Sequence, residues 1–532
     1  MGSRDRAAIG QTIGSVVLEL QPESVGKLRA QLEQMRLRQE ALTEAFGSIR
    51  HAMPLLHFMS VTIFADDQYD PILVVEVNFD GPQGPFWAQF EAAFGEDLRS
   101  MLRCGRVPHD GRRDLFLAVT RAGSSLPIAP LLEALVVLPS AGHQGNRGLS
   151  RARIEVEGEL FGAVQKLLDR GTLPKDATQV AIHRIVRETL LPRFSWLADA
   201  VPLRIGAVES WMDWLRLIGF AALVLFAMLL PGIVLSLVIP SIAALALLLW
   251  AGAALLSRLG LGLSSQPTAA AIFQFFKAGS VVLVATAAMA ALCAVPASIH
   301  DWRFDQFGRV FGVVAVHFGL GVIGLFPTVT GILVWLRSLE GRDAPQDAPP
   351  RDEVALSAMA RREDKIAQNH MGSVVHLKPG LLRAVLVRVA LQVMGLVLRV
   401  RARNGFLGSM RTIHFAHWAV VSNGARLMFL SNFDGSWESY LDDFVEKAHG
   451  GLTLAWTSCV GFPTTRFMTL DGATQGRKFK AWARHSMAES LFWYSAYVSF
   501  TVNQIERQAR VANGLCRVSL GEVEAAAWAL DL

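Results

Sequence analysis

The residues best suited to chemistry occur twice in this chain, in the same order. A histidine followed by phenylalanine, His57 in the first half and His414 in the second, lies in an apolar, β-branched segment. An Asn-Phe-Asp-Gly segment follows each of them, with Asp80 in the first half and Asp434 in the second. Histidine can ligate a metal ion, and aspartate can act as acid, base or polar contact. The repetition predicts one folding unit used twice, whose copies meet and build a shared site.

Each of these residues also has a purely structural interpretation. An aspartate just before a helix often only caps it, and a following glycine often only makes the turn. The neighbouring Asn78 and Asn432 share either role. Arg466 follows the last expected strand and suits a carboxylate or propionate partner, although a surface charge is equally compatible with its position. Both interpretations stay open at this level.

The elements around these residues follow one pattern in both halves. The second half predicts a strand at 372–377, a helix at 381–403, a hairpin at 412–421 and 426–433 with a turn at Ser422-Asn423-Gly424, a helix at 437–449 and a strand at 452–457. The first half predicts a strand at 13–20, a helix at 23–50, a hairpin at 56–64 and 72–80, a helix at 86–102 and a strand at 114–119. The order is β-α-β-β-α-β, that of the ferredoxin-like unit.

Two such units commonly pair their sheets into an α+β barrel. The arrangement resembles the dimeric α/β-barrel superfamily, which includes the dye-decolorising peroxidases. In those enzymes a GxxDG segment supplies a distal aspartate, an arginine assists it, and a histidine ligates haem iron. The resemblance therefore implies catalytic roles for Asp80, Asp434 and Arg466, and haem-binding roles for the residues His57, His414, Asn78 and Asn432. Both Asp-Gly segments lack the leading glycine of that pattern.

An apolar segment separates the two copies. No Asp, Glu, Lys, Arg or His occurs from 217 to 257, which is too long for one bilayer crossing and predicts two helices with a turn near Pro231-Gly232 or Pro240. Further spans are predicted at about 278–299 and 310–336. His317, in the last of these, is either a functional residue or a satisfied helix contact. Four spans place both soluble ends on one side, and the flanking basic residues favour the cytoplasm.

Composition narrows the classes of function. The chain is 52% hydrophobic and its net charge is only +5, which gives no argument for nucleic acid. The four cysteines are far apart and fit neither a disulfide framework nor a zinc site. A transporter is disfavoured, because the spans lack charged residues.

These observations predict four regions: a ferredoxin-like repeat with extra helices (1–205), four membrane helices (206–337), a linker (338–370) and a second repeat (371–532). We expect an inner-membrane, multi-pass protein with a cavity between its repeats, in contact with the bilayer and capable of homo-oligomerisation. The first functional hypothesis is a peroxidase-like oxidoreductase that uses haem and a lipophilic substrate. The alternative is a non-enzymatic protein that binds an apolar ligand or a protein partner.

Overall fold

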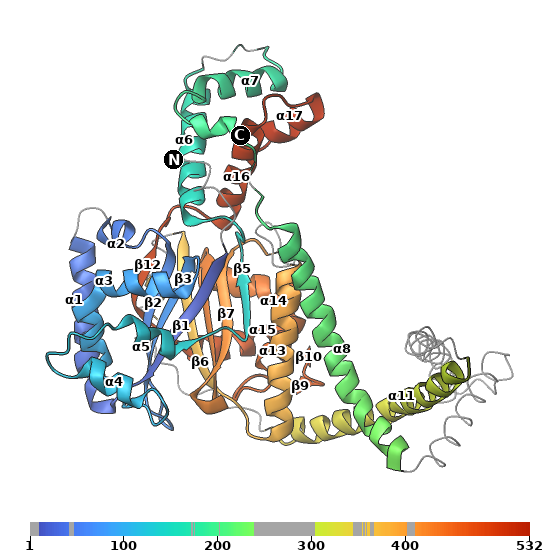
Figure 1. Cartoon of the computed structure of the whole chain (residues 1–532). Helices are drawn as coiled ribbons and strands as arrows, with labels where there is room; N and C mark the ends of the chain where they lie inside the picture. The colour runs from blue at the N-terminus through green and yellow to red at the C-terminus, as the bar shows by residue number, and fades with distance from the viewer. Residues whose placement is uncertain are drawn as a thin grey trace. The chain divides into compact units, whose positions relative to one another are not determined.

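The chain forms two compact units. The computed structural model describes residues 10–41, 47–171, 174, 176–201, 203–238, 304–343, 354, 357, 359–361, 367–401 and 410–532. The first unit, here the sheet unit, contains Met1–Leu215 and Ala344–Leu532, and the second, here the apolar helical unit, contains Arg216–Asp343. The two ends of the chain, separated by the apolar segment, therefore belong to one unit, as their internal similarity predicts (Figure 1).

The N-terminal half builds one antiparallel sheet in the order β12-β2-β3-β1-β4. Its own strands are β1 (Gln11–Glu19), β2 (Leu56–Phe64), β3 (Ile72–Asp80) and β4 (Val136–Val137). β3 lies between β1 and β2 over its full length, with Ser15 opposite Glu76 and Ser60 opposite Glu76. Alternating β-branched and aromatic residues favour these strands. The predicted hairpin at 56–64 and 72–80 is confirmed.

The C-terminal half repeats this sheet in the order β11-β6-β8-β7-β5. Its own strands are β6 (Gln368–His376), β7 (Ile413–Val421), β8 (Arg426–Asp434) and β11 (Met487–Ala488). The predicted turn is present as η4 (Ser422–Gly424), where Asn423 and Gly424 take positive φ values of 53° and 91°. Asparagine and glycine tolerate this left-handed conformation, which explains the Asn-Gly pair.

Each sheet takes its fifth strand from the other half of the chain. β12 (Ser490–Ser495) pairs antiparallel with β2, and β5 (Ala141–Gln144) pairs antiparallel with β7. The two copies are therefore interlocked within one chain. The sheets face one another, because Phe64, Ile72 and Val74 of one sheet cluster with Ala419, Met428 and Leu430 of the other.

Helices cover the outer faces of the sheets. Figure 1 shows one group beside the N-terminal sheet and another beside the C-terminal sheet. The first group comprises α1 (Val25–Ala41), α2 (Gly47–Ala52), α3 (Gln83–Leu102), α4 (Arg113–Thr120) and α5 (Ala129–Leu135). The second comprises α13 (Leu381–Arg401), α14 (Trp437–Trp456) and α15 (Gly476–His485), next to the short β9 (Thr465–Arg466) and β10 (Leu470–Asp471). They bury apolar side chains such as Phe86, Trp437 and Phe479.

A further layer of helices follows the exchanged strands. α6 (Arg151–Asp169) comes after β5, and α16 (Val502–Cys516) comes after β12. They pack together with α7 (Gln179–Leu190) and α17 (Glu522–Ala529) around a separate apolar core that includes Leu160, Val186 and Leu515. Ser150 and Thr501 cap the two long helices by accepting backbone N–H bonds.

Both predictions of a final strand are wrong. Residues 114–119 belong to α4, where Phe116 and Val119 are buried at helical spacing. Residues 452–457 mostly continue α14, which passes Gly450-Gly451 with a distortion at Ala448 instead of ending there. The strands that complete the sheets, β4 and β11, lie later in the sequence and contain two residues each. The single helix predicted at 23–50 is also incorrect, because α1 ends at Ala41 and α2 starts at Gly47.

The described part of the apolar helical unit consists of two long helices. α8 (Ala207–Val238), which begins in the sheet unit, continues through Pro231, so the turn predicted at Pro231-Gly232 is wrong; Pro240 lies outside the described residues. α11 (Phe304–Glu340) contains the predicted span at 310–336, whereas the one at 278–299 lies outside the described residues. Gly232 and Gly324 lie so close that a Cβ on Gly324 would lie 2.5 Å from the Gly232 Cα. His317 Nδ1 lies 2.6 Å from the Ser236 hydroxyl, a helix–helix contact.

Three helices among the described residues are long and apolar enough to cross a membrane. They are Ala207–Val238, Gly308–Glu340 and Leu381–Arg401. The third is α13, which packs against β5 and α14 of the sheet unit. Length and composition thus identify a membrane protein, and the packing of α13 favours α8 and α11 as the crossing helices.

Candidate functional site

The structure brings each histidine against the aspartate of its own copy. His57 Nε2 lies 2.9 Å from Asp80 Oδ1, and His414 Nε2 lies 2.8 Å from Asp434 Oδ1. All four side chains are buried, with at most 7% exposed. We call these pairs the two His–Asp pairs.

A β-bulge aims each histidine at its aspartate. The pairing of β2 with β3 shifts between Leu56 and Phe58, and the pairing of β7 with β8 shifts between Ile413 and Phe415. The residue that is skipped is the histidine, and a bulge redirects the side chain of the extra residue.

The phenylalanine after each histidine contacts the other His–Asp pair. The Phe58 and His414 ring centroids are 5.1 Å apart, and those of Phe415 and His57 are 5.5 Å apart. The repeated His-Phe dipeptide thus supplies one ring to its own pair and one ring to the opposite pair. The two pairs lie together at the interface of the sheets.

The second oxygen of each aspartate binds the start of a helix. Asp80 Oδ2 accepts the backbone N–H of Arg151 at 2.7 Å, and Asp434 Oδ2 accepts that of Val502 at 2.7 Å. These are the first residues of α6 and α16, whose N–H groups have no partner within the helix. The partial positive charge of a helix N-terminus also stabilises the carboxylate. The interpretation that each aspartate caps the helix that follows it is therefore wrong, because Ser436 caps α14 and α3 has no side-chain cap. The aspartates instead bind the starts of helices that are distant in sequence.

The two pairs differ at the remaining ring nitrogen. His57 Nδ1 lies 2.8 Å from the hydroxyl of Tyr497, on the loop between β12 and α16. Burial raises the pKa of Tyr497 well above its usual value, and the nearby Asp80 adds to this shift. His414 Nδ1 has no hydrogen-bond partner among the described residues. Asn146 occupies the position equivalent to Tyr497, and it donates to Glu506 at 2.8 Å instead.

Asn78 and Asn432 converge on a buried carboxylate that the sequence analysis missed. Both donate to Glu76 Oε1, at 3.1 and 3.2 Å. The opposite oxygen of Glu76 lies 2.9 Å from His370 Nε2 and accepts from Ser60 at 3.1 Å. A glutamate inside an apolar strand was the available signal.

The hydrogen bonds keep Glu76 ionised. Burial alone would raise its pKa, but the bond and charge of His370, the charge of His417 and the Asn78 bond lower the pKa to about 2. Burial lowers the pKa of His417, although Glu76 opposes that shift. His417 Nε2 lies 3.0 Å from the Ser15 hydroxyl, which ties the second sheet to the first.

Arg466 is not brought to either His–Asp pair. It lies on β9, is 58% exposed and pairs with Asp471 on β10 at 2.6 Å. The Asp471 carboxylate raises the pKa of the Arg466 guanidinium. Its position matches the surface interpretation.

The His–Asp pairs do not fit a haem. Both ring nitrogens of His57 are engaged, one by Asp80 and one by Tyr497. The ring of His414 packs against Phe58 and Tyr497, with centroids 5.1 and 6.1 Å apart, and its Nε2 faces Asp434. His57 thus has no free ring nitrogen for a haem iron, and aromatic rings pack directly against the ring of His414. Among the described residues, no group of three His, Cys, Asp or Glu side chains has the arrangement of a metal site.

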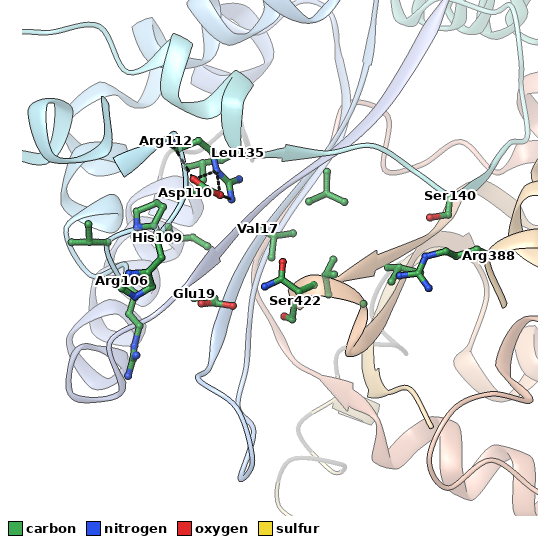
Figure 2. A pocket seen from close by; sticks show the side chains of 18 of the residues that line it. Val17, Glu19, Arg106, His109, Asp110, Arg112, Leu135, Ser140, Arg388 and Ser422 are labelled. Atoms are coloured by element: carbon green, nitrogen blue, oxygen red, sulfur yellow. Dashed lines mark hydrogen bonds and ion pairs between the residues drawn. The ribbon is translucent and has the colours of Figure 1, made fainter. Parts of the chain in front are cut away.

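A polar cleft opens at the edge of the interface between the two halves. It has a volume of about 880 Å³ and is lined by both halves of the chain (Figure 2). The N-terminal half contributes Val17, Glu19, Arg106, Asp110 and Arg112, and the C-terminal half contributes Arg388, Val421 and the turn Ser422–Gly424. We call it the turn cleft.

The position equivalent to the turn cleft is covered in the other half. There the hairpin connection is longer (65–71), and it crosses to the C-terminal sheet: Asp66 lies 2.5 Å from His376 Nε2 and 3.5 Å from Arg426. The ring of Tyr69 covers the Arg426 guanidinium at 5.2 Å. The C-terminal hairpin has only the tight Ser422–Gly424 turn, which leaves its cleft open.

Most charges in the turn cleft already have partners. Arg106 pairs with Asp70 at 2.7 Å, and Arg112 pairs with Asp110. Arg388, on α13, donates to the Ala384 carbonyl at 2.8 Å. Figure 2 shows Arg388 on the side opposite Arg106 and Arg112, with Val17 and Ser422 between them.

Comparisons of the chain with protein-family models, curated proteins and solved structures find no match.

Proposed function

We propose that this is a membrane-attached binding protein whose sheet unit holds a small molecule in the turn cleft. The observation that carries this proposal is the break in internal symmetry, which closes one of two equivalent positions and leaves the other as an opening of about 880 Å³. Pockets of this size between two halves of a molecule are common binding sites for small molecules.

The proposal includes a finer description of the fold. The strand orders β4-β1-β3-β2 and β11-β6-β8-β7 support two ferredoxin-like repeats that pair as an α+β barrel. The apolar stretch supports an anchor of four helices in the inner membrane, with both ends of the chain in the cytoplasm.

The buried polar residues between the sheets support this function by holding the two halves of the sheet unit in place. One oxygen of Asp80 and one of Asp434 accept the backbone N–H bonds that fix α6 and α16, and the other oxygen of each binds its histidine. Glu76 binds side chains from both halves. Buried polar networks that are well satisfied rigidify a structure. The carboxylates between the sheets are thus occupied by the protein's own groups, and the ligand binds at the edge of the interface.

The cleft suits a ligand with an apolar body and one acidic group. Val17, Val420 and Val421 give it an apolar wall. Arg388 has no carboxylate partner among the described residues, and its guanidinium can hold a carboxylate or phosphate by two parallel bonds.

Native mass spectrometry of the full-length protein, purified in detergent, tests the binding function. Gln392 is exposed on α13 and lines the cleft, so Gln392→Trp would fill it without entering the core. We expect a stoichiometric bound molecule in the wild type and in the control Leu381→Trp, an exposed position on the same helix, and its loss in Gln392→Trp. A bound molecule that survives Gln392→Trp, or none in the wild type, would contradict the proposal.

An oxidoreductase is the second candidate, and the bond between Tyr497 and His57 favours it. A tyrosine that can pass its proton to a neighbouring imidazole is easier to oxidise than an isolated one. Peroxide-dependent oxidation of a dye by the purified protein, lost in Tyr497→Phe and retained in Arg466→Gln, would support this candidate. Equal turnover in wild type and Tyr497→Phe would exclude a role for this hydroxyl.

A further inference from the structure

A second cleft continues the turn cleft along α13. It has a volume of about 360 Å³ and shares Ser140 and Gln392 with the turn cleft. Its far end is lined by His143 and Arg399. The distance along the helix from Arg388 to Arg399 is about 16 Å at 1.5 Å per residue. Because the two clefts share these lining residues and follow one another along α13, we infer that they form one elongated groove.

His143 gives the far end of the groove a specific chemistry. The residue lies on β5, is 2% exposed, and neither ring nitrogen has a hydrogen-bond partner among the described residues. Buried polar atoms without a partner are rare, and each calls for an explanation. Burial lowers the pKa of His143 to about 4, so the ring is neutral at pH 7. A neutral imidazole offers one donor and one acceptor.

The charges near His143 are already balanced. Asp213 lies 2.7 Å from Arg147 and 2.9 Å from Arg399. Burial alone would raise the pKa of Asp213, but these two guanidinium groups lower it. A second anionic group is therefore not required at this end, whereas a hydroxyl would satisfy His143.

Apolar side chains line the groove beside polar ones such as Gln11, Thr12 and Gln144. Ile13, Leu138 and Pro139 line one side, and Leu396 and Leu398 on α13 line the other. Combined with Arg388 at one end, this pattern matches an elongated amphiphile.

We propose that the groove binds a long-chain hydroxy acid, with the carboxylate at Arg388 and the hydroxyl at His143. This inference rests on the proposed binding function and names its ligand class. The occupied groove would run along α13 between the two halves of the sheet unit.

Two fatty acids that differ by one hydroxyl test the inference. Ricinoleate carries a hydroxyl far from its carboxylate, and oleate lacks it. Titration of the full-length protein in detergent, followed by native mass spectrometry, compares their affinities under equal partition into the micelle. We expect ricinoleate to bind about fivefold more tightly, the value of one neutral hydrogen bond.

Matched variants test which residue binds the hydroxyl and which binds the carboxylate. His143→Phe should abolish the preference for ricinoleate, and His143→Gln, which keeps a donor and an acceptor, should retain part of it. Arg388→Gln should weaken both acids about tenfold and leave their ratio unchanged, because it removes one charged bond. Arg401→Gln, an exposed position on the same helix outside both clefts, should change neither affinity.

The inference is overturned if the wild type does not discriminate between the two acids, if neither binds, or if His143→Phe keeps the preference while its melting temperature shows a folded protein. The binding function would survive these results if Gln392→Trp still removed the molecule that co-purifies with the wild type. If Gln392→Trp also failed to remove the co-purifying molecule, both the ligand class and the binding function would be overturned.

Discussion

The two halves of the sheet unit share a frame and differ where a ligand could enter. Both place a histidine at a β-bulge, bind it to an aspartate and use that aspartate to hold the start of a helix. They differ in the hairpin connection, seven residues at 65–71 against the short Ser422–Gly424 turn. They also differ at Tyr497 and Asn146, which face equivalent positions. The shared features therefore build the fold, and the unshared features are the better guide to function.

The largest expected effect is the loss of stability when a His–Asp pair is broken. Asp80→Ala would leave His57 and the N-terminus of α6 without their common acceptor, so it should destabilise the sheet unit by about 3–5 kcal/mol. Asp434→Ala should cost somewhat less, because His414 Nε2 also lies 3.3 Å from Gln368 Nε2, which can donate to it once the aspartate is gone. Thermal unfolding followed by tryptophan fluorescence measures both.

The control for these variants is Asp97→Ala. Asp97 pairs with the exposed Arg38, so its removal should leave the melting temperature nearly unchanged. If Asp80→Ala and Asp434→Ala behaved like this control, the two pairs would not be the structural frame described here.

The next effect tests the contact between the halves. Glu76→Gln removes the charge that faces His370 and His417, and should destabilise by about 2–3 kcal/mol at pH 7. The pKa of Glu76 falls from 4.5 to about 2 on folding, so its stabilisation is complete above pH 4.5 and is lost as the pH falls towards 2. Melting temperatures of both proteins should therefore converge below pH 4.5. A constant difference down to pH 3 would contradict the assigned pKa.

A smaller effect distinguishes the exchanged strands. His143 of β5 corresponds to Tyr494 of β12, and only the histidine changes its protonation on unfolding between pH 4 and 6.5. Because burial lowers its pKa from 6.5 to about 4, the unfolded chain binds a proton first, and stability falls as the pH drops from 6.5 towards 4. His143→Phe should remove up to about 1.4 kcal/mol of this loss per pH unit in that range. Parallel pH dependence of melting in both proteins would show that His143 is not neutral and buried.

Part of this architecture could be predicted from the sequence. Both hairpins and the helix α13 follow from alternation, the Asn-Gly turn and helical capping signals, which act locally. The duplication correctly predicted that the two ends would meet. The exchange of β5 and β12 could not be predicted, because short strands have no distinctive period and their partners lie more than two hundred residues away in the sequence.

Only part of the candidate site could be predicted from the sequence. The pairing of His57 with Asp80 depends on a bulge, and sequence alternation does not reveal a bulge. Tyr497 reaches His57 across 440 positions, and no local pattern connects them. The turn cleft is open because the C-terminal hairpin lacks a connection as long as 65–71, and this depends on how the two halves pack. Glu76 was the exception, since a charged residue within an apolar strand is a readable signal.

The smallest expected effect concerns Arg466, a residue for which the resemblance and the structure diverge. The resemblance implied a catalytic role for Arg466, yet Arg466 lies exposed and pairs with Asp471. Exposed ion pairs contribute little, because water and salt screen them and ordering two long side chains costs entropy. Arg466→Gln should therefore leave the melting temperature, the bound molecule and the preference for ricinoleate unchanged. A loss of binding in this variant would place the β9–β10 hairpin at the ligand site. The ligand would then not bind in the groove along α13.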